Sequence, residues 1–174
     1  MRKVEVSSYN GKWIQMFIEE AEKLNLIFGN ELVDIYHIGS TSVPGLKAKP
    51  IIDIMPVVKD INNVEKYNIG MQEIGYVPKG ENGIVKRRYF QKGGDNRTHH
   101  VHIYQIGSCE INRHLAFRDY LKSHPDEMKN YGELKEKLAQ QFPLNKKSYI
   151  NGKDYFVKNI ELKALEWYED NRNK

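Results

Sequence analysis

The chain has 174 residues, a net charge of +4, 40% hydrophobic residues and 29% charged residues. This length predicts one domain with a buried core, and the mild positive charge favours anionic partners without requiring nucleic acid, which we do not expect as a partner. No run approaches the roughly 20 apolar residues of a membrane span, the first thirteen residues lack the apolar core of a signal peptide, and the single Cys109 cannot form an internal disulfide. We therefore expect a cytoplasmic protein with no membrane partner.

The first part of the chain predicts a helix followed by two strands. Apolar residues recur at helical spacing over residues 11–28, and Gly29 ends this pattern. Residues 32–38 form a short apolar strand, whereas the continuous apolar run over residues 51–58 is typical of a strand buried on both faces. Residues 39–49 between them predict a turn and a short connector.

The middle of the chain predicts one helix and one hairpin. Asp60 is a candidate N-cap for a helix over residues 61–74. Two strand candidates, residues 84–91 and 98–106, flank a cluster of turn residues at 92–96, and this arrangement is typical of a hairpin. With the two earlier strands, the hairpin gives a mixed sheet of about four or five strands.

The last part of the chain is helical. Helical spacing recurs over residues 111–121, over 125–142 behind a proline, and over 156–167. The expected fold class is therefore α+β. We expect a single domain over residues 1–174, with a mixed β-sheet and flanking helices over about 1–107 and a C-terminal helical cap over about 108–174.

The most informative segment joins the first two strands. Gly39, Ser40 and Thr41 close the first strand, and Asp53 lies thirteen positions after Ser40 inside the second strand. A backbone without a Cβ can approach phosphate closely, and a carboxylate on the neighbouring strand can hold a divalent cation against the same phosphates. This pattern indicates a site for a nucleoside triphosphate and its metal. The alternative is a plain turn and a structural aspartate paired with a cation such as Lys49.

The same segment resembles the signature of the GrpB-like proteins. The resemblance rests on Gly-Ser-Thr-Ser-Val-Pro-Gly-Leu at 39–46, Lys-Pro-Ile-Ile-Asp-Ile at 49–54, and later motifs at 98–102, 117–121, 131–135 and 149–153. This family is assigned by similarity to the nucleotidyltransferase superfamily. The resemblance therefore implies a nucleotidyltransferase-like sheet, and an activity that moves a nucleotidyl group.

One position departs from the pattern of active nucleotidyltransferases, which place two acids at alternate strand positions. Alternate positions share one face of a strand, so the partner of Asp53 should be residue 55, which is Met55. A two-metal mechanism needs several carboxylates. Either another ligand substitutes for the second acid or the two-metal chemistry is absent.

His100 and His102 are the candidate substitutes, because they share a face of the predicted strand over 98–106. We therefore expect Asp53, His100 and His102 to hold a divalent metal, with Asp53 and His102 as the catalytic residues. Mg²⁺ or Mn²⁺ is the expected ion, and Zn²⁺ is the alternative that imidazole ligands would favour. The competing interpretation is a pair of polar side chains on a solvated face.

Basic side chains near this segment are candidates for phosphate binding. With Gly39, Ser40 and Thr41, the predicted phosphate-binding residues are Lys49, Arg88, Arg118 and Lys135. Alternation places Arg87 and Arg88 on opposite faces of their strand, and we expect Arg88 to face the pocket, where a guanidinium can bind phosphate through two bonds. Lys153 ranks below Lys135, and each of these cations could instead be an ordinary surface residue.

The sequence therefore predicts a nucleotidyltransferase-like protein. It would bind a nucleoside triphosphate or another phosphorylated small molecule with a divalent metal, and transfer a nucleotidyl group to an acceptor that the sequence does not define. Two alternatives stay open. Met55 favours a degenerate module that binds a nucleotide or metabolite without turnover, and the histidines favour a metal-dependent phosphoester hydrolase. The sequence does not define the oligomeric state.

Overall fold

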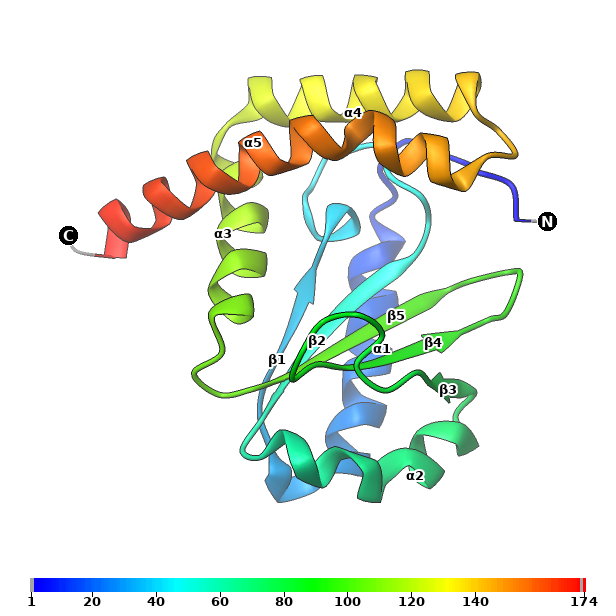
Figure 1. Cartoon of the computed structure of the whole chain (residues 1–174), viewed down its shortest axis with the longest axis vertical. Helices are drawn as coiled ribbons and strands as arrows, with labels where there is room; N and C mark the ends of the chain where they lie inside the picture. Colours follow the sequence, from blue (N-terminus) through cyan, green and yellow to red (C-terminus); the bar gives the residue numbers. More distant parts are fainter. Residues whose placement is uncertain (1, 173) are drawn as a thin grey trace.

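A computed structural model describes residues 2–172 and 174 and shows a twisted sheet with helices on both faces and across one end (Figure 1). The five strands lie in the order β1-β2-β5-β4-β3. They are β1 (Leu32–Ile38), β2 (Ile52–Val58), β3 (Tyr76–Pro78), β4 (Arg88–Lys92) and β5 (His99–Gln105). The pair β2 and β5 is parallel and the other pairs are antiparallel, which confirms the mixed sheet and the α+β class.

The helices divide between the two faces of the sheet. On one face lie α1 (Lys12–Phe28) and α2 (Asn68–Glu73), and on the other lies α3 (Cys109–Ser123). Across one end of the sheet, α4 (Pro125–Gln141) and α5 (Lys146–Arg172) run side by side (Figure 1). These three C-terminal helices form the predicted cap, whereas the organisation of the chain as one domain stays a prediction.

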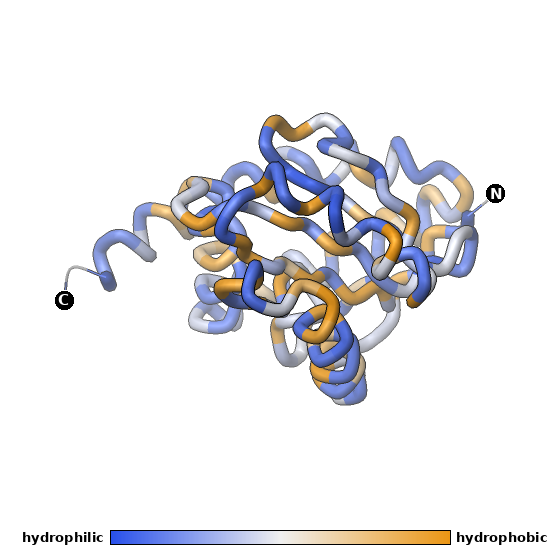
Figure 2. Tube along the Cα trace, turned by 90° about the horizontal axis from the view of Figure 1, so that it is seen from below, coloured by the Kyte–Doolittle hydropathy of each residue, from blue (hydrophilic) through white to orange (hydrophobic). Residues whose placement is uncertain are grey.

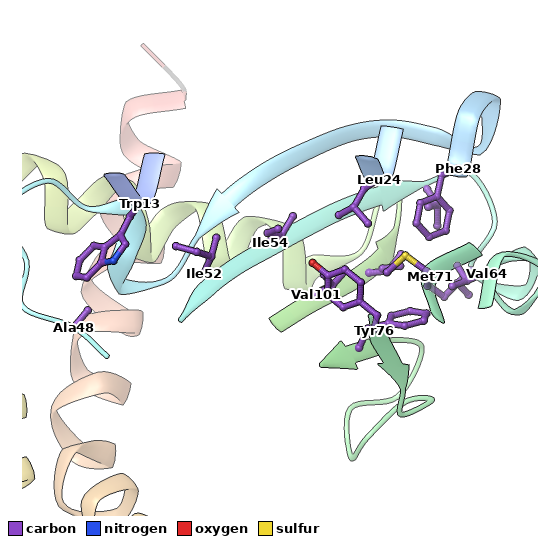
Figure 3. Close-up of a cluster of buried hydrophobic side chains, with 14 residues drawn as sticks. Trp13, Leu24, Phe28, Ala48, Ile52, Ile54, Val64, Met71, Tyr76 and Val101 are labelled. Carbon is purple, nitrogen blue, oxygen red and sulfur yellow. The ribbon is translucent and has the colours of Figure 1, made fainter. Parts of the chain in front are cut away.

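The main core lies between the sheet and α1, and it decides which way the side chains of β2 point. Leu24 and Phe28 of α1 pack with Ile52 and Ile54 of β2 in this core (Figure 3). Successive side chains of a strand point to opposite faces. Asp53, which lies between the two isoleucines, therefore points to the other face of the sheet, toward the cap.

The predicted helix over residues 61–74 has two parts. It begins as a 3₁₀ helix, η3 (Ile61–Tyr67), and continues as α2. The predicted cap at Asp60 is confirmed, because its carboxylate accepts a hydrogen bond of 2.9 Å from the backbone N–H of Asn62. The start and the cap of this element were therefore predicted correctly, and its helix type was not.

The predicted strand over residues 84–91 is wrong in its first half. Residues 79–87 form turns, in which Asn82 and Lys86 adopt positive φ angles of 48° and 64°. The strand β4 begins only at Arg88. The short β3, which pairs with β4 at the edge of the sheet, was not predicted.

The C-terminal end of α5 extends beyond the rest of the molecule (Figure 1). Its colouring in Figure 2 is mostly hydrophilic, which matches the exposure of residues 169–172. Across residues 2–172 and 174, none of the helices combines the length and the apolar character that crossing a bilayer requires.

Candidate functional site

The backbone of Gly39 lies directly against the carboxylate of Asp53. β1 and β2 are antiparallel and pair Ile38 with Asp53, so the turn after β1 meets the start of β2. Gly39 has a φ of 70°, and a Cβ built on it would lie 2.6 Å from Oδ2 of Asp53. Glycine is therefore required here both for its backbone conformation and for the close approach of the acid.

The substitution Gly39→Ala tests this contact. We expect the free energy of unfolding to fall by about 1–3 kcal/mol from backbone strain, with a further loss because the added methyl group displaces the Asp53 carboxylate. Gly29→Ala is the matched control, because Gly29 also has a positive φ, of 52°, but a Cβ there would meet no atom within 4 Å. Urea unfolding should show a larger loss for Gly39→Ala, and equal losses would contradict the contact.

Two histidines of the neighbouring strand face the carboxylate of Asp53, and His102 is hydrogen-bonded to it. Oδ1 of Asp53 lies 3.0 Å from Nε2 of His102 and 3.5 Å from Nδ1 of His100. Burial alone would raise the pKa of Asp53, but the hydrogen bonds from His100 and His102 outweigh it and hold that pKa well below its usual range. Asp53 is therefore an ionised carboxylate at neutral pH.

The donor atoms of Asp53, His100 and His102 all lie within 4.8 Å of one another, a spacing at which three such groups could hold a metal ion. The second ring nitrogens argue against that use. Nε2 of His100 lies 3.0 Å from Nη1 of Arg97, and Nδ1 of His102 lies 3.5 Å from Nη1 of Arg87. A metal-bound histidine normally donates its other N–H to an acceptor, whereas arginine only donates. With these contacts in place, the two histidines do not fit a resident metal.

A cavity of about 160 Å³ opens beside Asp53 and brings together five segments of the chain. We call it the lysine cavity, and its polar lining includes Ser40, Thr41, Lys49, Asp53, Lys135 and Lys153. Lys135 comes from α4 and Lys153 from α5, whereas Ser40 lies in the turn after β1 and Asp53 at the start of β2. The cap and the sheet therefore contribute jointly to one cationic hollow.

Lys135 is the most unusual residue of the lysine cavity. It is 2% exposed, and among the described residues its Nζ has no hydrogen-bond partner. Its Nζ lies 4.4 Å from the centre of the Tyr131 ring. Burial lowers the pKa of Lys135 well below its ordinary value, and the nearby Lys153 and Lys49 lower it further.

The environment of the other two lysines, Lys49 and Lys153, also disfavours their charged forms. Burial, with the charges of Lys153 and Lys146, lowers the pKa of Lys49 to about 8. Burial also lowers the pKa of Lys153, partly offset by Asp53. Nζ of Lys49 and Nζ of Lys153 lie 5.2 Å and 5.1 Å from the centre of the Tyr149 ring. Three amines thus converge with a single carboxylate, so the lysine cavity attracts anions.

A second cavity of about 300 Å³ lies on the other side of Asp53. It shares Ser40, Asp53 and Lys153 with the lysine cavity, and its wall adds His114 and Phe117 from α3. Burial, with the charge of Arg113, lowers the pKa of His114 to about 3, so this imidazole is neutral. Asp53 therefore lines both a cationic cavity and a larger one whose wall carries the acidic side chains Asp154 and Glu161.

Two predicted phosphate ligands lie away from both cavities. Arg88 pairs with Ile103 across the sheet, on the α1 face, and forms an ion pair with Glu65. The expectation that Arg88 faces the pocket is therefore wrong, and Arg87 is the arginine on the Asp53 face. Arg118 lines neither cavity, because its Nη1 donates to the backbone carbonyl of His37 at 3.1 Å.

The remaining predicted residues lie at the site. Ser40 lines both cavities, while Thr41 and Lys49 line the lysine cavity. The hydroxyl of Thr41 also lies 2.9 Å from Nε2 of His37, which burial keeps neutral by lowering its pKa to about 4. Residue patterns gave no indication of His114, and they ranked Lys153 too low.

Fold and site together define an α+β protein with an anion-attracting cavity between its sheet and a helical cap. The family described as GrpB protein matches residues 3–163, so the chain belongs to the GrpB family. It is 52% identical to the UPF0157 protein YqkA of Bacillus subtilis over 172 residues, which is 99% of this chain and 50% of that protein. The chain thus spans half the length of this relative.

One solved structure agrees with the family assignment, and a second is only remotely similar. The crystal structure of the conserved protein GrpB from Enterococcus faecalis has a TM-score of 0.92 and 46% identity, covering 94% of this chain and 99% of that one. The Cid1 poly(U) polymerase bound to MgATP has a TM-score of 0.48 and 10% identity, covering 75% of this chain and 45% of that one. A likeness as remote as the second carries no argument about activity.

Proposed function

We propose that this protein binds a nucleoside triphosphate, with its phosphates in the lysine cavity, and transfers the nucleotidyl group to an acceptor. The buried amine of Lys135 carries this proposal. A buried amine without a hydrogen-bond partner is destabilising, and burial disfavours its charged form, whereas an anion in the cavity would favour the charged form and pair with Lys135, Lys49 and Lys153 at once. A chain of phosphates is the biological anion that three converging amines suit best.

The residues around the cavity suggest how transfer would proceed. An oxygen of the acceptor attacks the α-phosphorus and loses its proton to water, while the bond to the β-phosphate breaks and pyrophosphate leaves. The three lysines stabilise the charge that develops on the pyrophosphate, and positioning supplies much of the remaining rate. Asp53 would be the residue that holds the Mg²⁺ accompanying the nucleotide, and that ion would supply charge neutralisation at the phosphates.

A ligand-binding role without turnover is the second candidate. Met55 occupies the strand position where a second acid would stand, and it is fully buried. It packs with Ile38, Tyr104 and Leu115, so no carboxylate reaches the cavity from this position. A single acid is enough to bind a nucleotide, and it is a weak basis for two-metal chemistry.

Thermal unfolding with nucleotides and Mg²⁺, followed by an assay for transfer of label from α-labelled nucleotide, tests the proposal. A nucleotide present at 100 times its dissociation constant should stabilise the protein by about 2.7 kcal/mol. Lys153→Met should weaken that binding at least about tenfold, because it removes one of three amines. Lys163→Met, on the same helix but paired with Glu127, which lines neither cavity, should leave it unchanged. Binding without transfer would favour the second candidate, and no binding would contradict both.

A further inference from the structure

We propose that His100 and His102 act as a pair of N–H donors that position Asp53, and that Arg97 and Arg87 hold each ring in the tautomer this task requires. The sequence favoured these histidines as metal ligands. The inference requires no nucleotide, so it does not depend on the proposed function.

The hydrogen-bond chemistry of each ring leads to one tautomer. A guanidinium has donors only, so the ring nitrogen that faces it must carry a lone pair. For His100 that nitrogen is Nε2, 3.0 Å from Arg97, and for His102 it is Nδ1, 3.5 Å from Arg87. The ring proton of each histidine then lies on the other nitrogen, which is the one that faces the acid.

The carboxylate of Asp53 requires the same tautomers from the opposite side of each ring. An ionised carboxylate only accepts hydrogen bonds, and Oδ1 of Asp53 faces Nδ1 of His100 and Nε2 of His102. Both nitrogens must therefore carry protons. The acid and the two arginines thus require the same tautomers, so each arginine–histidine–aspartate chain is consistent from end to end.

The arginine behind His102 is a fixed part of the fold. Arg87 is 7% exposed, although it lies in a turn-rich segment. Its Nη2 donates to the backbone carbonyl of Asn82 at 2.8 Å, and its Nε donates to that of Glu81 at 3.1 Å. Its guanidinium also lies 4.8 Å from the centre of the Tyr89 ring. The turns at 79–87 therefore hold the guanidinium of Arg87 beside Nδ1 of His102, the ring nitrogen that faces away from Asp53.

Arg97 has a similar role at the other histidine. Its Nε donates to the backbone carbonyl of Gly94 at 3.2 Å, in the turn that joins β4 to β5. Tyr89 lies between the two arrangements, with its ring centre 5.6 Å from that of His100 and 5.2 Å from that of His102. The two histidines are therefore fixed by neighbours on β4 and its flanking turns.

This arrangement disfavours a metal on either histidine. To bind an ion on the side of Asp53, each ring would move its proton to the nitrogen that faces arginine, where two donors would oppose each other. Metal-bound histidines have the reverse surroundings. We therefore assign Arg87 and Arg97 as positioning residues, which act on Asp53 through the histidines and keep its charge and its direction fixed.

Long-range ¹H–¹⁵N spectra of the labelled full-length chain test the tautomers directly. We expect the proton on Nδ1 of His100 and on Nε2 of His102, with no change when Zn²⁺ is added in equimolar amount. The opposite tautomer in either ring would overturn the inference. So would a stoichiometric metal in the purified protein that His102→Ala removes.

Arginine variants supply the second measurement. Arg97→Met and Arg87→Met remove the opposing donors, while Asp53 still holds the proton on the nitrogen that faces it. Each change should therefore raise the affinity for Zn²⁺ at least about tenfold, and a mixture of tautomers should appear at its own histidine only when Asp53→Ala is added. Arg88→Met is the matched control, because Arg88 pairs with Glu65 on the other face of the sheet and should change neither property. If Arg87→Met does not fold, Arg97→Met still tests the inference at His100. An unchanged Zn²⁺ affinity in Arg97→Met would overturn the inference.

Discussion

Lys135→Met is expected to stabilise the ligand-free protein and to abolish its binding of inorganic triphosphate. Methionine fills a volume similar to that of lysine without a buried amine, and replacing buried charges by well-packed apolar groups can stabilise a protein by about 1–4 kcal/mol. The same change removes the most deeply buried amine of the lysine cavity. Urea unfolding measures the first effect, and titration calorimetry with inorganic triphosphate measures the second.

The lowered pKa of Lys135 also predicts how the free energy of unfolding changes with pH. Burial lowers the pKa of Lys135 in the folded protein well below its ordinary value of 10.5. Between those two values the unfolded chain binds more protons than the folded one, so the free energy of unfolding rises with pH. Lys135→Met should lose much of this slope. A smaller slope should persist between about pH 8 and 10.5, because the pKa of Lys49 is lowered to about 8.

Lys129→Met is the matched control for Lys135→Met. Lys129 lies on the same helix, and its side chain is 75% exposed. It should change the free energy of unfolding by less than about 0.5 kcal/mol and leave triphosphate binding unchanged. A destabilised Lys135→Met protein, or one that keeps its triphosphate affinity, would contradict the role of Lys135 as the centre of an anion site.

The first two strands could be predicted because the information that defines them is local. β1 and β2 are apolar runs bounded by glycine, proline and polar residues, and both predicted ranges agree with the structure to within one residue. The edge strand β3 has three residues, of which Val77 is exposed. It exists because β4 supplies its hydrogen-bond partners, and such a pairing leaves no periodic signal in the sequence.

For the side chains of the site, too, the sequence predicts some features and not others. Alternation along a strand places Arg87 and Arg88 on opposite faces, but which face holds the site depends on the pairing of Arg88 with Ile103 in β5. Lys153 has the pattern of an exposed helical lysine, and it lines the lysine cavity only because α5 crosses the end of the sheet. Tertiary arrangement, which no local pattern encodes, decided both cases.

Asp53→Asn should change binding and transfer in opposite directions. Asp53 is the one carboxylate that lines the lysine cavity among the described residues, so removing its charge should tighten the binding of metal-free inorganic triphosphate by about tenfold. Any transfer of label from nucleotide should fall by at least about 100-fold, because the charge that orients the reacting groups is lost. Calorimetry without Mg²⁺ and the transfer assay measure the two effects separately.

The pair of results separates the candidate functions. Tighter triphosphate binding together with lost transfer supports an enzyme in which Asp53 serves the reaction rather than the binding of phosphate. Tighter binding with no transfer in either protein supports the ligand-binding role. If Asp53→Asn instead weakens the binding of triphosphate in the absence of Mg²⁺, Asp53 must hold a cation that is already bound to the protein, and that cation would attract the anion. That result would contradict both the unassisted action of the lysines and the assignment of His100 and His102 as donors to a free carboxylate.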